Sequence, residues 1–260
     1  MTPPKKQTPS PDAAVQKARL DVDRPPPPEV KEDAIWCRDH RARPYTFPAS
    51  LELIRTFHGH VAPGLVIGLK MVDLARQHLP RDILFDALCE TASCLPDAVQ
   101  LLTPCTVGNN WLTIRDLGKF ALTLYDKSNG RGCRVFPDPA KLAAWPQLYD
   151  WYYKRKSKAE QDFSGLIDDI RQAGADCLSL APVEIAPIHL TRHSKGPIAT
   201  CPVCGEAYPE KHGDRCRGCQ GQTPYTRPHG SRDRTPPAGP AVETDPVEKA
   251  EGRRWRPDMT

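Results

Sequence analysis

The sequence predicts an α+β protein, with helices packed on a mostly antiparallel sheet and a small zinc-binding module after it. Three observations lead to this fold class. Segments with helical periodicity alternate with short alternating segments through the middle of the 260-residue chain. Two Cys-x-x-Cys pairs follow, the first at Cys201. The 29 prolines gather at the ends, with eight in residues 1–33 and seven in 223–260.

The first helices are predicted from apolar spacing. Leu51, Ile54 and Phe57 share one helical face, so we expect a helix over 50–57. His58-Gly59-His60 interrupts it. A second helix is expected to begin at Pro63-Gly64, because proline suits a first helical turn, and to end near Pro80.

The strands are predicted from alternation and from turn residues. Ile83, Phe85, Ala87 and Cys89 alternate with their neighbours, which indicates a strand over 83–91. Asp-Leu-Gly and Ser-Asn-Gly are turn signals between further strands. The remaining expected elements are strands at 111–115, 119–125 and 131–136, helices at 96–102, 138–156 and 159–172, and an extended segment at 178–188.

Composition divides the chain into four parts. Residues 1–33 contain four consecutive prolines from Pro25 and have balanced charge, so a disordered arm is expected. The core is expected over 34–192, the zinc finger over 193–222 and a second disordered tail over 223–260.

Charge and hydropathy limit the partners and the compartment. The net charge of +4 is a weak bias, so a nucleic-acid partner is not expected. The longest uncharged stretch in the most apolar region, 56–69, is shorter than the roughly 20 residues of a membrane span. Residues 1–28 have no apolar run typical of a secretory signal. We therefore expect a cytoplasmic protein without a membrane partner.

Four of the ten cysteines form a metal-site pattern. They are Cys201, Cys204, Cys216 and Cys219. Two Cys-x-x-Cys knuckles let four thiolates surround one zinc ion in a tetrahedron. All four positions are protein ligands, so the predicted zinc is structural. A redox role is disfavoured by Pro202 and by the matched second pair.

A second site is predicted in the core. His58 and His60 flank a glycine at a helix break, and neutral imidazole is a good ligand for zinc, nickel or iron. Cys105 lies in a loop between a helix and a strand, where its thiol is a candidate ligand or nucleophile. We expect these three side chains to converge on one divalent metal. Neighbouring candidates are Cys94, Asp97, Gln100 and Asn109.

These motifs resemble the E subunit family of molybdenum or tungsten formylmethanofuran dehydrogenase. The resemblance rests on FHGHVAPGLVIGLKM, CLPDAVQLLTPCTVGNNWL, DLGKFALTLYDK and the zinc module, and it covers roughly residues 48–221. It implies an α+β core similar to the sheet domain of glyceraldehyde-phosphate dehydrogenases. It also implies a treble-clef zinc finger and a homodimer.

The resemblance carries over residue by residue. His58, His60, Pro63 and Gly64 match a motif that usually reads His-Gly-His-x-Cys-Pro-Gly, but Ala62 replaces its cysteine. The loop cysteine corresponds to Cys105, with Pro104 at the usual glycine. Asp97, Ala98 and Gln100 match a third element. The implied core site keeps His58, His60 and Cys105, with one open metal position.

Three functions stay open. The resemblance implies a metal-binding accessory or regulatory protein of molybdenum or tungsten enzymes in one-carbon metabolism, with dehydrogenase subunits as partners. A metal-dependent enzyme using the histidine and cysteine site is the second. The third is a zinc-finger adaptor that binds nucleic acid or protein. The chain has no pattern for a molybdopterin-binding subunit or an iron–sulfur cluster, so formyl oxidation by this chain is not expected.

Overall fold

The computed structural model describes residues 34–190 and 194–225. The chain divides into two compact units after residue 191, and each is described by itself. The arm predicted for residues 1–33 and the tail predicted from 223 lie outside the described residues, apart from 223–225.

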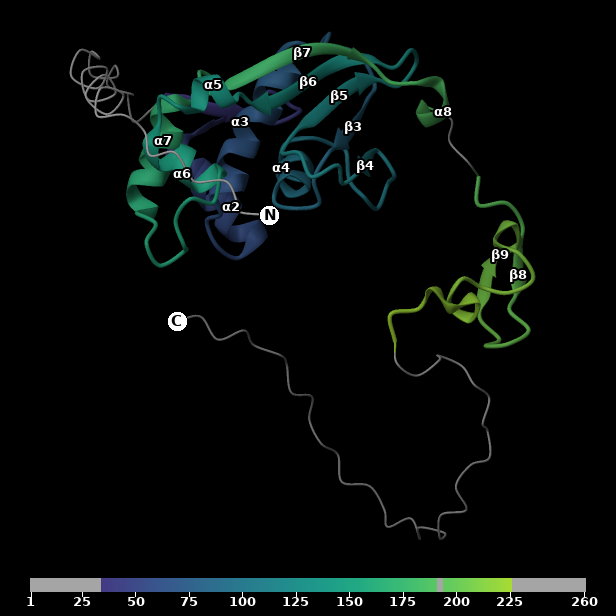
Figure 1. Cartoon of the computed structure of the whole chain (residues 1–260). Coiled ribbons are helices and arrows are strands. Elements are labelled where there is room, and N and C mark those ends of the chain that lie inside the picture. The colour runs from purple at the N-terminus through teal and green to yellow at the C-terminus, as the bar shows by residue number, and fades with distance from the viewer. Residues whose placement is uncertain (1–33, 191–193, 226–260) are drawn as a thin grey trace, which may run out of the picture. The chain divides into compact units, whose positions relative to one another are not determined.

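The first unit is built on a five-stranded sheet with the order β4-β3-β5-β6-β7 (Figure 1). The parallel pair is β3 with β4, and the other three pairings are antiparallel. The predicted α+β class with a mostly antiparallel sheet is confirmed. The strands are β3 (Phe85–Cys89), β4 (Leu112–Ile114), β5 (Leu122–Asp126), β6 (Arg131–Pro137) and β7 (Leu178–Glu184).

One face of the sheet forms the core. Ala87, Leu124 and Cys133 lie in register across β3, β5 and β6, and all three are buried. Side chains alternate between faces along a strand, so Arg134 belongs to the opposite face. This alternation explains why β6 reads as polar and apolar by turns in the sequence.

Helices cover the core face of the sheet (Figure 1). They are α2 (Phe47–His58), α3 (Pro63–Gln77), α4 (Leu95–Leu102) and α7 (Phe163–Ala173). Helix α3 is buried along most of its length and packs on α4 through small residues. A Cβ atom placed on Gly68 would lie 2.9 Å from the Cβ of Ala98, so glycine permits this close approach.

The break after α2 forms as the sequence predicts. Gly59 adopts φ +87°, and its N–H donates to the carbonyl of Arg55, which closes the helix. The helix begins earlier than expected, because Thr46 accepts the N–H of Ala49 as N-cap. Before it lies a hairpin, β1 (Ile35–Arg38) and β2 (Pro44–Thr46), that the sequence pattern did not reveal.

Two predicted elements are wrong in continuity. The helix expected over 138–156 is divided into α5 (Pro139–Leu142) and α6 (Pro146–Tyr152), because Pro146 has no N–H for a continuous helix. The segment expected to be extended over 178–188 ends as strand β7 at Glu184. A short helix, α8 (Pro187–Leu190), follows it.

The second unit is small and has few regular elements. A hairpin of β8 (Ile198–Thr200) and β9 (Ala207–Pro209) is followed by short helical turns at Glu210–His212 and Gly218–Gln222. The hydroxyl of the buried Tyr208 donates to the carbonyl of Gly213 at 2.8 Å. Across both described segments of the chain, no helix has the length and apolar character needed to span a bilayer.

Candidate functional site

The second unit assembles the four predicted cysteine ligands. The sulfur atoms of Cys201, Cys204, Cys216 and Cys219 all lie within 4.8 Å of one another. The Cys204 and Cys216 sulfurs are 3.7 Å apart. This matches the edge of about 3.8 Å that Zn–S bonds of ~2.3 Å give in a tetrahedron. The donor set and its spacing therefore fit zinc.

Backbone hydrogen bonds hold the two knuckles. The N–H of Gly205, at φ +78°, donates to the carbonyl of Cys201, which turns the first knuckle. The N–H of Cys219 donates to the Cys216 sulfur at 3.4 Å in the second. The N–H of Cys216 donates to the Cys201 sulfur at 3.5 Å and links the knuckles. N–H donors of this kind stabilise thiolates.

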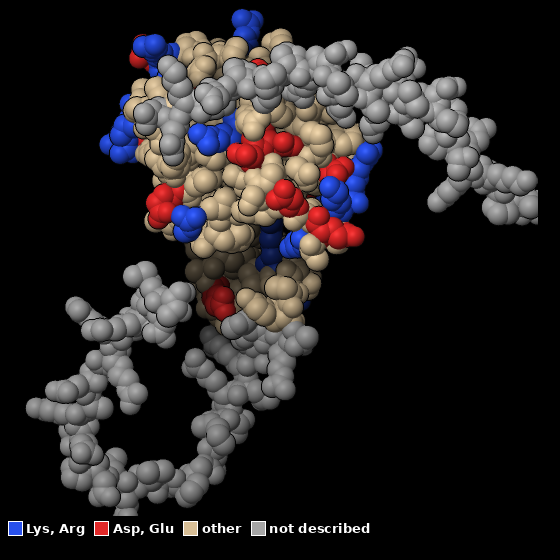
Figure 2. Space-filling view, turned by 90° about the vertical axis from the view of Figure 1, so that its left-hand side faces the viewer, with Lys and Arg blue, Asp and Glu red and all other residues tan. Residues whose placement is uncertain are grey.

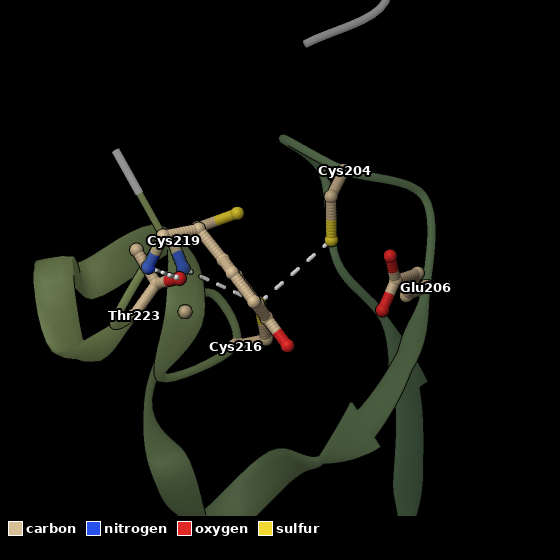
Figure 3. A pocket seen from close by; sticks show the side chains of 7 residues that line it. Cys204, Glu206, Cys216, Cys219 and Thr223 are labelled. Atoms are coloured by element: carbon tan, nitrogen blue, oxygen red, sulfur yellow. Dashed lines mark hydrogen bonds between the residues drawn. The ribbon is translucent and has the colours of Figure 1, made fainter. Parts of the chain in front are cut away.

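The environment of Cys201 favours its thiolate form. Burial acts to raise the pKa of this thiol, but N–H groups of Cys204, Cys216 and Val203 outweigh burial and lower the pKa to about 6. A hollow of about 450 Å³ adjoins the cluster and is lined by Glu206 and Thr223 among others. Figure 3 shows the sulfurs of Cys204 and Cys219 facing the same space. Zinc held there is structural, because four thiolates complete its coordination.

The core contains a second cluster, built on two histidines. His58 is the last residue of α2, and Asp97 lies in the first turn of α4. The Nδ1–H of His58 donates to Oδ2 of Asp97 at 2.8 Å. The ring of His60 lies 4.8 Å from that of His58, centroid to centroid. The two imidazoles and the carboxylate form what we call the histidine cluster.

The orientation of His58 is chemically informative. A carboxylate on Nδ1 fixes the tautomer and leaves Nε2 as a lone-pair donor, as in metal sites where a carboxylate supports a histidine ligand. The side chains of His58 and Asp97 are 25% and 31% exposed, so a ligand can reach them. His60 is exposed. The cluster therefore offers accessible imidazole nitrogens to a metal or a substrate.

Cys94 lies beside the histidine cluster in a strained conformation. It is the N-cap residue of α4, with φ +52°, and it is half-buried. The thiol pKa is raised by burial and by the nearby Asp97 carboxylate. A Cβ atom on Gly64 would lie 3.0 Å from the Cys94 Cβ, so the glycine at the start of α3 makes room for this residue.

Cys105 lies elsewhere in the core. It follows the far end of α4, whose eight residues span about 12 Å. Its thiol is completely buried and donates to the carbonyl of Phe85 in β3 at 3.6 Å. Burial raises the thiol pKa to about 11. Among the described residues, His58, His60 and Cys105 do not bring their ligand atoms together as the four cysteines do.

The other two predicted neighbours shape the Cys105 loop. The amide of Asn109 donates to the carbonyl of Pro104 at 2.7 Å, and its oxygen accepts the N–H groups of Thr106 and Trp111. The side-chain oxygen of Gln100 accepts the N–H of Val107 at 3.4 Å. These contacts fix the loop conformation and give Asn109 and Gln100 structural partners.

Sequence reasoning missed one buried ion pair. Arg134 on β6 donates to both carboxylate oxygens of Glu90, the residue after β3, with Nη2 to Oε2 at 2.7 Å. Glu90 is 6% exposed. The two are 44 positions apart, and they meet because β5 lies between β3 and β6 in the sheet. Only the strand order reveals this pair.

Fold and site together define a protein with an α+β core and a four-cysteine zinc finger. Residues 57–186 match the family described as FmdE, molybdenum formylmethanofuran dehydrogenase operon, and residues 192–226 match the FmdE treble clef zinc finger. The chain belongs to the FmdE family, which confirms the family resemblance. A similar crystal structure is that of an FmdE-like protein of tungsten formylmethanofuran dehydrogenase from Syntrophus aciditrophicus. It is 48% identical with a TM-score of 0.65, and the match covers 73% of this chain and 98% of that one.

A second relative carries a different name. A probable S-adenosyl-L-methionine-binding protein from Archaeoglobus fulgidus is 28% identical over 179 residues. The match covers 58% of this chain and 46% of the relative. This chain therefore spans less than half of that protein.

Proposed function

We propose that this chain is a metal-binding accessory or regulatory protein that works with a molybdenum or tungsten enzyme of the formylmethanofuran dehydrogenase type, in one-carbon metabolism. The family membership supports the link to that enzyme class. The observation that carries a binding role for the core is the contact of His58 with Asp97 beside His60. In this proposal the finger is a structural element and the histidine cluster binds the ligand.

The ligand proposed for the histidine cluster is a divalent transition metal such as zinc. His58 would bind it through Nε2, with Asp97 holding the ring, and His60 would supply a second nitrogen. When bound, such a metal would act as a Lewis acid toward a water or a small ligand in an open position. Ala62, at the position of the family's cysteine, supplies no donor.

Two cysteines are candidates for a third ligand. The sequence favours Cys105, whereas accessibility favours Cys94, because Cys94 is half-buried and Cys105 is completely buried. Cobalt added to the chain with its finger already zinc-loaded would distinguish them. A thiolate-to-cobalt absorption band that is lost in Cys94→Ser and kept in Cys105→Ser would select Cys94. The opposite pattern would select Cys105, and no band in the unaltered chain would leave only the imidazoles.

The partner proposal has its own test. The tagged chain, expressed in a native host that makes a molybdenum or tungsten dehydrogenase, should co-purify with subunits of that enzyme. A matched His58→Ala/His60→Ala chain shows whether the cluster contributes to the association. Recovery of the chain without any such subunit would count against the accessory role. The same preparation, analysed by light scattering, tests the proposed homodimer, and fractionation tests the proposed cytoplasmic location.

A metal-dependent enzyme is the second candidate, and the His58–Asp97 contact favours it specifically. A carboxylate that orients an imidazole is also the arrangement of a general base. The relative's name adds S-adenosyl-L-methionine to the ligands worth testing. Calorimetric titration of that compound into the chain and into Asp97→Ala would show binding at the cluster as a loss of affinity in the variant.

The adaptor function has less support. The finger carries Lys211, Arg215 and Arg217, but Glu206, Glu210 and Asp214 oppose them. The face of the molecule in Figure 2 shows both charge signs interspersed among neutral residues. Nucleic acid is bound mainly through many phosphate contacts, which need a concentrated basic surface. Salt-sensitive binding to random DNA would favour this candidate.

A further inference from the structure

A second hollow lies at the other end of α3 from the histidine cluster. Helix α3 has 15 residues, so its ends are about 22 Å apart. Between its C-terminal end and the turn that joins β1 to β2, a cavity of about 660 Å³ opens. Its charged lining comprises Arg38, Arg41, Arg76, Arg81, Asp39 and Asp73. We call it the arginine pocket.

The carboxylates of the pocket already have partners. Asp39, 4% exposed, accepts the N–H groups of Arg41 and Arg43 at 2.9 and 3.0 Å and the Nε of Arg43 at 2.6 Å. Asp73, also 4% exposed, accepts the N–H of Arg38 at 3.0 Å and the amide of Gln77 at 2.7 Å. Their charges therefore act mainly to fix the turn and the helix.

Arg76 gives the pocket a fixed positive wall. Its guanidinium donates to the carbonyls of Leu79, Pro80 and Arg81, the last at 2.7 Å. It also lies 5.1 Å from the ring centroid of Phe85. These contacts hold its charge at the C-terminal end of α3 without neutralising it, because carbonyl oxygens carry no formal charge.

Three further guanidinium groups remain available. Arg41 and Arg81 are exposed and form no ion pair among the residues that the structure describes. Arg38 reaches Asp73 only at 3.9 Å. Arg41 is held on a tight turn, since the N–H of Ala42 donates to the carbonyl of Asp39 at 2.9 Å. The donors therefore project from a rigid frame.

We propose that the arginine pocket binds a small organic phosphate. Guanidinium groups offer paired N–H donors that match the oxygens of a phosphate group, and several of them are needed to balance its double charge. The volume lies within the range of small-molecule sites, so it admits the phosphate together with an organic part. Gln77 and His40 line the same cavity and offer neutral polar contacts to that part.

The test is calorimetric titration of the full chain with pyrophosphate, with ATP and with citrate at physiological salt. We expect pyrophosphate and ATP to bind, and citrate to bind at least about tenfold more weakly, because it has no phosphate group. In Arg41→Gln/Arg81→Gln, phosphate affinity should fall by about tenfold or more. Both arginines are exposed, so this variant should fold, and the single variants serve if it does not.

Arg131→Gln is the matched control, because Arg131 is an exposed arginine on β6 that does not line the pocket. It should leave phosphate binding unchanged. Equal weakening in this control would show attraction by overall charge and overturn the proposal. Absence of binding by both phosphates, or tighter binding of citrate, would overturn it as well.

Discussion

The Nδ1 atom of His58 lies 2.8 Å from Oδ2 of Asp97, which joins the last residue of one helix to the first turn of another. The contact spans 39 positions of sequence. It directs Nε2 of His58 away from the carboxylate and places His60 beside it. The histidine cluster thus depends on how α2 and α4 meet.

Removal of the Asp97 carboxylate should affect binding more than stability. Both side chains of the pair are partly exposed, so Asp97→Ala should lower the free energy of unfolding by about 1 kcal/mol or less. Zinc affinity of the core should fall by about tenfold or more, because His58 loses its orienting partner. Urea unfolding and zinc titration measure the two effects. Glu52→Ala, which removes an exposed ion pair on α2, is the control.

The close approach of α3 to Cys94 predicts a steric effect. In Gly64→Ala the new Cβ would lie 3.0 Å from the Cβ and 3.1 Å from the sulfur of Cys94, so the free energy of unfolding should fall by about 1–3 kcal/mol. Adding Cys94→Gly should recover part of the loss, since it removes the clash and relieves φ +52°.

Gly108→Ala is the matched control for this prediction. Its new Cβ would meet only the Thr106 hydroxyl, at 3.9 Å, and its melting temperature should be close to that of the unaltered chain. Equal melting temperatures for Gly64→Ala and Gly108→Ala would contradict the proposed packing.

The buried pair of Glu90 and Arg134 predicts a pH-dependent loss of stability. Arg134→Met leaves the Glu90 carboxylate buried without its partner, which should cost about 3 kcal/mol near neutral pH. The side-chain bond from Arg134 lowers the pKa of Glu90 below its usual 4.5. The stabilisation is therefore present above pH 4.5 and is lost as pH falls through the lower, folded-state pKa.

Urea unfolding of the two chains at neutral and at acid pH measures this effect. The difference in unfolding free energy between the unaltered chain and Arg134→Met should shrink below pH 4.5. Arg115→Met, at an exposed arginine, should show little loss at any pH. A difference that stays constant into acid would contradict the role of this pair.

The zinc finger should unfold without its metal while the core stays folded. Cys204→Ser removes one of the four ligands and should release about one zinc per chain, since metal binding supplies the folding free energy of so small a unit. Core helical signal should change little. Val203→Ser, beside the ligand and 49% exposed, should retain its zinc. Zinc retention by Cys204→Ser would contradict the assignment.

Local features of the fold and the site could be predicted from sequence, and contacts between distant segments could not. The cysteine knuckles and the break at Gly59 follow from neighbouring residues, so spacing and glycine suffice to predict them. The side of α4 on which Cys105 comes to lie depends on its contact with Phe85, 20 positions away. The hairpin before α2 was missed because its strands are only three or four residues long.

Metal stoichiometry of the full chain tests the central claim most directly. After equilibration with buffered zinc, we expect about two zinc ions per chain for the unaltered protein and about one for His58→Ala/His60→Ala, because the finger keeps its own ion. Elemental mass spectrometry measures both. One zinc in each protein, with no change on loss of the two histidines, would contradict a metal site at the histidine cluster.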